Sequence, residues 1–157
     1  MAPPSKVIYT GEYRHSRDAK GRLTIPSKWR PRAGEEDEDY LALPNPSNRS
    51  ITIYPPRRAA KFIERMEELS IVNPEEQVAL VKLSAIAQSF TYDSQGRMSL
   101  SDKLLKYAGI EGKEVVLQGN FSTFSIWNPE RYDSVVADDV DKQSEELSEL
   151  LPKLGLI

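Results

Sequence analysis

An internal duplication is the feature that most restricts how this chain can fold. Residues 18–25 read DAKGRLTI, and residues 93–100, which lie 75 positions later, read DSQGRMSL. Residues 51–58 (ITIYPPRR) and 124–131 (FSIWNPER) form a second matching pair at an offset of 73. Both pairs align without gaps and in the same order, which indicates two copies of one unit. Because a unit of half this length would bury little surface alone, the two copies are expected to share one core.

Each copy has the pattern of a strand, a tight turn, a second strand and a short helix, followed by a strand pair and a longer helix. In the second copy, alternating polar and apolar residues predict strands at 88–92, 97–100, 113–117 and 123–127. Ser101 is expected to cap the short helix, and Gly109 to follow its end. In the first copy, Pro26 and Pro31 bracket a helix of about one turn.

Helices are expected between and after the copies. Residues 56–69 and 74–88 form two of them, and the second opens with Asn73 and Pro74 at its cap and first position. One long helix from Pro129 onwards carries an apolar stripe and an acidic opposite face. The predicted fold class is therefore α+β and β-dominated, built as one compact unit. Its parts are the first copy at residues 7–54, connecting helices at 55–87, the second copy at 88–132 and a C-terminal acidic amphipathic helix at 133–157.

The repeated Asp-x-x-Gly-Arg element assigns a physical role to each fixed residue. Asp18 and Asp93 can accept hydrogen bonds from their own turn, and Gly21 and Gly96 can adopt positive φ. The arginine that follows each glycine, Arg22 or Arg97, presents a planar fork of donors suited to a phosphate or to a guanine edge. The alternative is that these residues only shape turns and that each arginine pairs with a nearby carboxylate.

The charge distribution favours a nucleic-acid partner for the first copy. The 157 residues carry 21 Lys and Arg against 24 Asp and Glu, a net charge of −3. Residues 1–32 alone hold eight basic residues against Glu12 and Asp18, which gives +6 there and −9 for the remainder. Binding of phosphate depends on the local potential, so this basic segment can face DNA. The candidate DNA contacts are Arg22 and Lys20, with Arg14, His15, Arg17, Lys28 and, in the second copy, Arg97.

The two copies are not equally charged, since Gln95 stands where the first copy has Lys20. The first copy is therefore expected to provide most of the energy of DNA contact. His15 is the only histidine, and a polar contact is expected for it rather than a metal or catalytic role. Trp127 ends an alternating strand and is expected in the core, whereas Trp29, between Lys28 and Arg30, is left open between core and surface.

Several function classes lack the residues that they need. The chain has no cysteine, which removes disulfides and thiolate metal sites and agrees with a reducing cytosol. No basic leader precedes an apolar run, and no apolar stretch is long enough to span a bilayer, so a cytoplasmic location is expected. No nucleophile stands beside a base, and the glycines are too sparse for a phosphate loop. We expect no enzyme activity, cofactor, metal or small-molecule substrate.

The repeated turns, together with GEYRHS at residues 11–16, RLTIP at 22–26 and YAGI at 107–110, resemble the MraZ family of bacterial transcription regulators. The resemblance extends over about residues 9–132. It implies two interlocked AbrB-like swapped-hairpin β modules, ring-like homo-oligomers, and association with the nucleoid. It also implies repression through short tandem DNA repeats upstream of the division and cell-wall gene cluster. The family's DNA-contacting arginines correspond to Arg22 and Arg97, and Lys20 occupies the basic position of the first turn.

Some residues depart from the family pattern. Arg17 stands where relatives have an apolar residue, Ser101 replaces a proline, and residues 34–39 are unusually acidic. The DNA sequence recognised can therefore differ from that of relatives. The alternative function is an antitoxin-like or scaffold module of the same fold, which would bind another protein through the acidic C-terminal helix.

Overall fold

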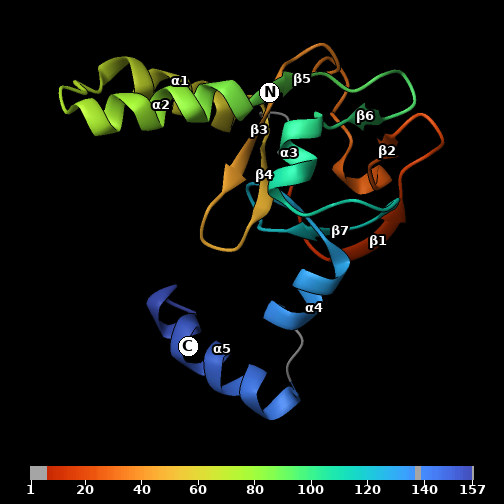
Figure 1. Cartoon of the computed structure of the whole chain (residues 1–157). Coiled ribbons are helices and arrows are strands. Elements are labelled where there is room, and N and C mark those ends of the chain that lie inside the picture. The colour runs from red at the N-terminus through yellow and green to blue at the C-terminus, as the bar shows by residue number, and fades with distance from the viewer. Residues whose placement is uncertain (1–6, 137–138, 157) are drawn as a thin grey trace, which may run out of the picture.

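The computed structural model describes residues 7–136 and 139–156 as a strand-rich α+β body from which two helices project as an arm (Figure 1). The strands are β1 (Glu12–Ser16), β2 (Arg22–Thr24), β3 (Tyr40–Asn45), β4 (Ser50–Tyr54), β5 (Gln88–Phe90), β6 (Arg97–Ser99), β7 (Glu114–Gly119) and β8 (Phe124–Trp127). The helices are η1 (Ser27–Trp29, 3-10), α1 (Pro56–Glu68), α2 (Pro74–Ile86), α3 (Asp102–Tyr107), α4 (Pro129–Val136) and α5 (Val140–Lys153). Helices α1 and α2 form the arm, and α5 lies apart from the sheet.

The strands of the two copies are interleaved. The larger sheet is antiparallel in the order β1-β7-β8-β4-β3-β5, and β2 pairs with β6 in a separate two-stranded ribbon. The first strand of each copy thus pairs with the third strand of the other copy, as β1 with β7 and β5 with β3. Because neither copy has a complete sheet of its own, the two copies form one folding unit. This architecture confirms the predicted strand-rich α+β class with two interlocked modules.

The strand registers reveal an approximate two-fold relation between the copies. In the ribbon, Leu23 lies opposite Met98, and in the larger sheet Thr52 lies opposite Ser125. Both pairs join residues that occupy the same position in the two copies of the sequence. Equivalent residues face each other in this way only where a two-fold axis passes between them. The two copies in the sequence therefore form two structural copies that are related by this axis.

The core contains buried aromatic residues from each copy. Trp29 is 1% exposed, and its ring packs against Tyr9, Tyr13 and Phe124 at centroid distances of 5.6, 5.2 and 5.0 Å. Trp127 is buried beside Tyr132, which confirms its predicted place in the core. Trp29, which the sequence left open, is a core residue too. Its burial fixes η1 and the residues that follow it.

The predicted helix caps are present. Ser101 Oγ accepts a hydrogen bond from Leu104 N at 3.3 Å at the start of α3, and Gly109 has a φ of 69° after its end. Asn73 Oδ1 accepts from the backbone N of Glu75 at 2.8 Å and caps α2. Since α2 ends at Ile86, its predicted end at residue 88 is two residues too late, and β5 ends before its predicted limit at 92.

The single C-terminal helix expected from the apolar stripe is wrong. The chain forms α4 and then α5, because Asp139 caps a new helix by accepting a hydrogen bond from Lys142 N at 2.8 Å. The cap of α4 is as predicted, with Asn128 Oδ1 accepting from Glu130 N at 2.8 Å. Residues 137 and 138, over which the stripe was expected to continue, lie outside the described residues. In the described part of the chain, no helix has both the length and the apolar character needed to cross a lipid bilayer.

Candidate nucleic-acid interface

The two Asp-x-x-Gly-Arg turns have the same hydrogen-bond pattern. In turn 1 (residues 18–22), Asp18 Oδ1 accepts from the backbone N of Lys20 at 2.9 Å and of Arg22 at 2.8 Å, and Asp18 Oδ2 accepts from Arg22 Nε at 2.7 Å. In turn 2 (residues 93–97), Asp93 accepts the three equivalent bonds at 2.9, 2.9 and 2.7 Å. The aspartate therefore fixes both the loop and the arginine side chain. The duplicated sequence has produced a duplicated geometry.

The glycine in each turn meets a conformational requirement. Gly21 has a φ of 78° and Gly96 a φ of 74°, in the left-handed region that residues with a Cβ adopt at a cost. Each glycine N donates to the carbonyl of its aspartate, at 2.9 Å in turn 1 and 3.0 Å in turn 2. The shape-determining roles predicted for Asp and Gly agree with this geometry.

The hydrogen bonds within each turn act on the aspartate's acidity. The pKa of Asp18 is lowered from its ordinary value, first by the hydrogen bond from the Arg22 backbone N and then by the Arg22 side chain and the Lys20 backbone N. The pKa of Asp93 is lowered by the equivalent groups of turn 2. Both turns therefore hold ionised aspartates at neutral pH.

Each turn arginine pairs with its aspartate and still presents donors to solvent. The pair uses the Nε atom of Arg22 or Arg97, and the two side chains are 32% and 23% exposed. Within residues 7–136 and 139–156, no hydrogen bond or ion pair occupies the terminal Nη atoms of either guanidinium. The ion pair between arginine and aspartate that the sequence suggested as an alternative is therefore present. It uses only the Nε atom, so it orients the guanidinium and leaves the Nη atoms available.

The ribbon of β2 and β6 places both arginines on one face. Leu23 and Met98 point into the core, at 1% and 5% exposure. The alternation of side chains along a strand then puts Arg22, Thr24, Arg97 and Ser99 on the opposite, outward face. The outward face of this short ribbon therefore carries two arginine side chains and two hydroxyl side chains.

Two more of the predicted contact residues lie at turn 1. Lys20 is exposed at the tip of the turn. Arg17 donates from Nη2 to the carbonyl of Gly112, and its Nη1 lies 3.9 Å from the position that a Cβ on Gly21 would take. Arg17 is therefore held beside the turn by the opposite copy. Lys28, another predicted contact residue, is exposed on η1.

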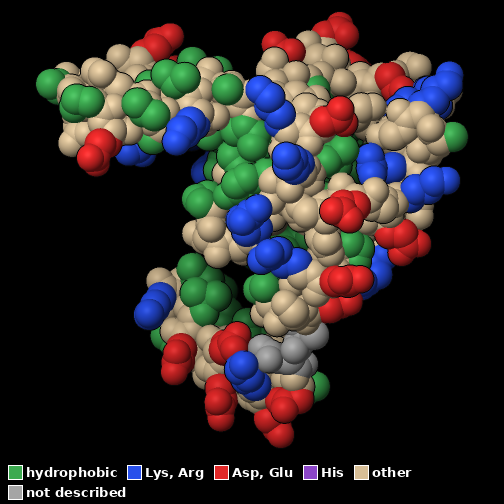
Figure 2. Space-filling view, viewed as in Figure 1, with side chains coloured by type: hydrophobic (Ala, Val, Ile, Leu, Met, Phe, Trp, Pro, Cys, Tyr) green, Lys and Arg blue, Asp and Glu red, His purple; other side chains and the backbone are tan. Residues whose placement is uncertain are grey.

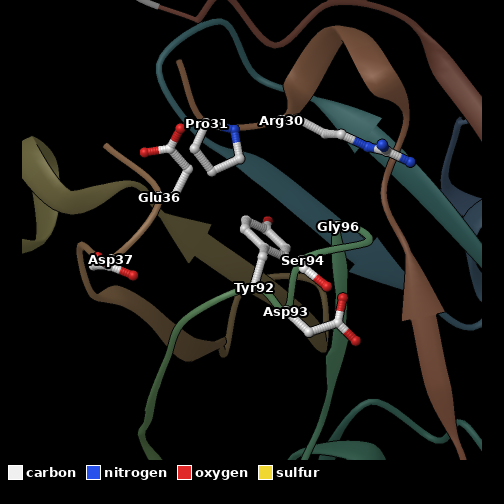
Figure 3. A pocket seen from close by; sticks show the side chains of 8 residues that line it. All are labelled: Arg30, Pro31, Glu36, Asp37, Tyr92, Asp93, Ser94 and Gly96. Carbon is white, nitrogen blue, oxygen red and sulfur yellow. The ribbon is translucent and has the colours of Figure 1, made fainter. Parts of the chain in front are cut away.

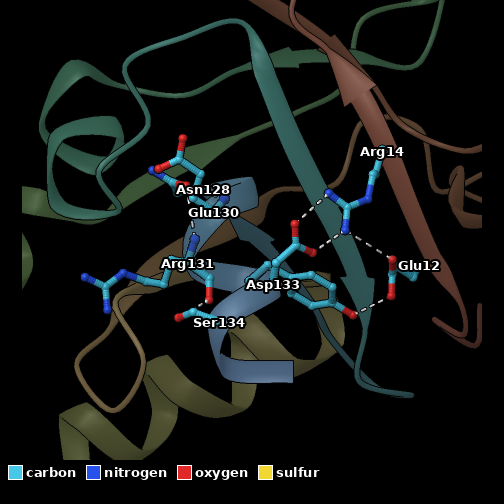
Figure 4. Close-up of polar contacts among 8 residues, drawn as sticks. Glu12, Arg14, Asn128, Glu130, Arg131, Asp133 and Ser134 are labelled. Carbon is cyan, nitrogen blue, oxygen red and sulfur yellow. Dashed lines mark hydrogen bonds and ion pairs between the residues drawn. The ribbon is translucent and has the colours of Figure 1, made fainter. Parts of the chain in front are cut away.

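Arg14 and His15, also predicted, lie on β1 and not at the turns. Arg14 forms an ion pair with Asp133 of α4, and its Nη2 is 3.7 Å from Glu12 Oε1 (Figure 4). Tyr132 donates its hydroxyl to Glu12 Oε2 at 2.7 Å in the same group. The His15 ring packs edge-on against Tyr13 at 6.3 Å between centroids. Arg14 thus attaches α4 to β1, which is a structural role.

Turn 2 has a cationic neighbour that the sequence pattern did not single out. Arg30, directly after η1, lies along Gly96 (Figure 3). The two residues line a surface hollow of about 480 Å³ together with Pro31, Tyr92, Glu36 and Asp37. Because the contact joins the first copy to the turn of the second copy, no local motif could indicate it.

Comparison with known proteins agrees with these features. The family model described as "MraZ protein, putative antitoxin-like" matches residues 8–82 and 83–151. A transcriptional regulator MraZ from Lachnoclostridium phytofermentans is 32% identical over 142 residues, which cover 90% of this chain and 96% of the relative. The transcriptional regulator MraZ of Corynebacterium jeikeium is 32% identical over 144 residues, covering 92% and 97%. That of Serratia proteamaculans is 32% identical over 143 residues, covering 88% and 93%. With two tandem family matches that coincide with the two interlocked copies, this chain belongs to the MraZ family.

Proposed function

We propose that the protein is a sequence-specific DNA-binding transcription regulator that places the outward face of the β2–β6 ribbon in the major groove. The observation that carries the proposal is the pair of arginines held by Asp18 and Asp93 with free Nη atoms. The major groove is about 12 Å wide and admits a two-stranded ribbon. The names of the relatives, which are transcription regulators rather than enzymes, support the same function.

The ribbon offers both kinds of contact that DNA recognition needs. Arg22 and Arg97 can bind phosphates or the O6 and N7 atoms of guanine, and Thr24 and Ser99 add hydroxyl donors and acceptors. Lys20 and Arg17 supply positive charge at turn 1, and Lys28 adds an exposed cation on η1. These charges attract the phosphate backbone regardless of sequence. The acidic remainder of the chain then faces away from the DNA.

A homo-oligomer on short tandem repeats is the second part of the proposal. One ribbon makes few phosphate contacts and binds weakly, whereas several ribbons in a ring bind tandem sites at high effective concentration. We infer that the operator is a set of short direct repeats upstream of the division and cell-wall gene cluster, that occupancy represses transcription, and that the protein acts in the cytoplasm at the nucleoid.

Two unpartnered apolar surfaces support self-association. An apolar groove runs between the sheet and the arm, lined by Leu41 and Leu43 of β3, Phe62 and Met66 of α1, and Leu80 and Leu83 of α2. Helix α5 exposes Leu147 and Leu150 along one face, at 46 and 48%, and its C-cap residue Leu154 is 59% exposed. Figure 2 shows hydrophobic side chains on the arm and on α5, with acidic side chains on the outer side of α5.

We propose that α5 of one subunit occupies the groove of the next. The acidic side chains of α5 complement exposed basic residues on the first half of α1, namely Arg57, Arg58 and Lys61. The groove and α5 are different surfaces of the same chain, so their contact is heterologous, and it forms a ring when the rotation between subunits closes.

The DNA proposal is tested by incubating the purified full-length protein with fragmented genomic DNA of its own organism and sequencing what it retains. Tandem short repeats should be enriched, and a duplex with several repeats should bind far more tightly than one with a single repeat. The apparent affinity should fall steeply with salt. Retention of random fragments, or equal binding to single and tandem sites, contradicts the proposal. Transcription in vitro from a selected promoter should decrease as the protein is added.

The oligomer proposal is tested with two double variants, Leu80→Glu with Leu83→Glu in the groove and Leu147→Glu with Leu150→Glu on α5. Each variant alone should be monomeric by light scattering, and the wild type should exceed a dimer. An equimolar mixture should form a one-to-one pair, because each variant retains the surface that the other lacks. Oligomers formed by either variant alone contradict the proposed contact.

The exposed apolar face of α5 also favours the alternative, in which an antitoxin-like or scaffold module binds another protein. Truncation after Val136 distinguishes the two. If the turns bind DNA, the truncated chain retains weak DNA binding while the oligomer and its avidity are lost. If α5 serves a protein partner, the truncation abolishes that partner's binding and leaves oligomer size and DNA affinity unchanged.

A further inference from the structure

We propose that Arg30 and Arg97, one from each copy, form a second phosphate-binding site at turn 2, so that both turns of a subunit bind the DNA backbone. The inference rests on the proposed DNA-binding function and extends it to the second copy. It concerns a residue that the repeated motif does not contain.

Arg30 is placed across turn 2 by the core. A Cβ built on Gly96 would lie 2.6 Å from Arg30 Nε and 3.1 Å from its Cζ, so the guanidinium rests directly on the glycine (Figure 3). Trp29, which is 1% exposed, anchors the preceding residue, and the Arg30 backbone N donates to Ser27 O at 3.3 Å. Ile25 N donates to Gly96 O at 3.1 Å and joins the two segments. The approach of Arg30 to turn 2 therefore belongs to the fold.

The charge of Arg30 is available to a ligand. Its side chain is exposed, and within the described ranges it makes no hydrogen bond or ion pair with another side chain. The nearest turn carboxylate, Asp93, already accepts from Arg97 Nε and from two backbone N–H groups. An exposed guanidinium that lies on the glycine directly before Arg97, without a carboxylate bound to it, is suited to a phosphate oxygen.

The position of Arg30 compensates for what the second copy lacks. Turn 1 has Lys20 at its tip and Arg17 beside it, whereas the equivalent residues of turn 2 are the neutral Gln95 and the buried Tyr92. Arg30 supplies the missing cation from the other copy. Each turn thereby has a second arginine close to its glycine, although the sequence of the second copy is electrostatically poor.

Acidic residues opposite Arg30 set the strength of this site. Glu36 and Asp37 line the same hollow and lie across it from the arginine (Figure 3). Both carry negative charge into the region that a phosphate would enter. Replacement of both by Gln and Asn should therefore strengthen DNA binding, with an effect opposite in sign to loss of Arg30.

The test compares Arg30→Ala, Arg30→Met and Arg65→Ala in the full-length protein, using fluorescence anisotropy with a tandem-repeat duplex at several salt concentrations. Arg30→Met keeps a long stem over Gly96 and removes the charge, so it separates packing from charge. Both Arg30 variants should lose about tenfold in affinity, and the slope of log K against log salt should decrease by about one for each subunit bound. Arg65→Ala, which removes an exposed charge from the second half of α1, should bind like the wild type.

Two results would overturn the inference. If Arg30→Met binds like the wild type, Arg30 acts only by packing, and if both Arg30 variants match Arg65→Ala, it does not contact DNA. Arg22→Ala measured in the same series separates this failure from that of the proposed function. Loss of binding in Arg22→Ala with no change in the Arg30 variants rejects the second site alone, whereas a wild type that does not bind DNA rejects the function. Melting temperatures of all variants show that each is folded.

Discussion

Arg22 and Arg97 lie diagonally across the β2–β6 ribbon, with Arg22 opposite Ser99 and Arg97 opposite Thr24. Diagonal neighbours in an antiparallel pair have Cα atoms roughly 7–8 Å apart. One subunit therefore presents two arginines at close spacing on a single exposed face. Their relation by the approximate two-fold axis means that the two arginines point along the ribbon in opposite directions.

The arginines should differ in importance because their surroundings differ. We expect Arg22→Ala to weaken DNA binding by tens of fold and Arg97→Ala by several fold, since a lost arginine contact costs about 1–3 kcal/mol and turn 1 has more cations whose contacts depend on its docking. Gel-shift titration of both variants on the same tandem duplex measures this. Equal losses in the two variants would show that the copies contribute equally.

Acid should weaken the turns through their aspartates. The pKa values of Asp18 and Asp93 are lowered in the folded chain, so their contribution to stability is present above the unfolded value of about 4 and is lost as pH falls through the folded values. Asp18→Asn with Asp93→Asn should lower the melting temperature at pH 7, and its difference from the wild type should shrink below about pH 4. Melting curves from pH 3 to 7 measure the difference.

The matched control for this pH effect is Asp37→Asn with Asp39→Asn. Both carboxylates are exposed and make no hydrogen bond or ion pair among the described residues. The control should melt close to the wild type at neutral pH. A turn variant whose difference from the wild type is the same at pH 3 and pH 7 would show that the aspartate charges do not stabilise the turns.

Features set by local sequence were predictable, and those set by distant contacts were not. The turns and the caps at Ser101, Asn73 and Asn128 depend on hydrogen bonds spanning a few residues, and each has the predicted form. The contact of Arg30 with Gly96 and the ion pair of Arg14 with Asp133 join segments that only the interleaved sheet brings together. No local pattern encodes them.

The C-terminal helices show a different limit of the sequence. The apolar spacing continues past Val136, and periodicity alone could not distinguish one helix from two in similar phase. The signal that could have separated them is Asp139, a good N-cap residue, followed two positions later by Asp141 in the first turn. An N-cap residue inside a periodic stretch indicates that a new helix begins. It is stronger evidence than an apolar stripe, which is compatible with one helix or with two.

Substitution of the turn glycines should separate strain from recognition. Gly21→Ala and Gly96→Ala both place a Cβ at positive φ, at a cost of about 1–2 kcal/mol in stability each. Only the Gly96 substitution also displaces a side chain, because the new Cβ would meet Arg30 Nε at 2.6 Å. We expect the two variants to lower the melting temperature by similar amounts. Only Gly96→Ala should also reduce the dependence of DNA affinity on salt concentration, because it displaces the Arg30 guanidinium.

A double variant tests the origin of that second effect. Arg30→Ala should remove any further loss of DNA affinity caused by Gly96→Ala, because the displaced charge is already absent. Gly21→Ala should add fully to Arg30→Ala, since a Cβ on Gly21 would meet no described residue, apart from its chain neighbours, closer than Arg17 Nη1 at 3.9 Å. Additivity of Gly96→Ala with Arg30→Ala would mean that the glycine acts on DNA binding independently of Arg30.

Phe121, in the turn between β7 and β8, has an energetically costly backbone conformation. Its φ is 68° and its side chain is 72% exposed, while its backbone exchanges two hydrogen bonds of 2.8 Å with Tyr9. Left-handed φ costs a residue with a Cβ roughly 1–2 kcal/mol, and asparagine tolerates it better than most. Phe121→Asn should therefore stabilise the fold by about 0.5–1 kcal/mol.

Phe121→Ala is the matched control, because it removes the ring and keeps the strain. Urea unfolding should rank Asn above both Ala and the wild type, and DNA affinity should be the same in all three. A gain shared by Ala and Asn would assign the cost to the exposed ring instead of the backbone, and a loss of DNA binding would place this turn in the interface.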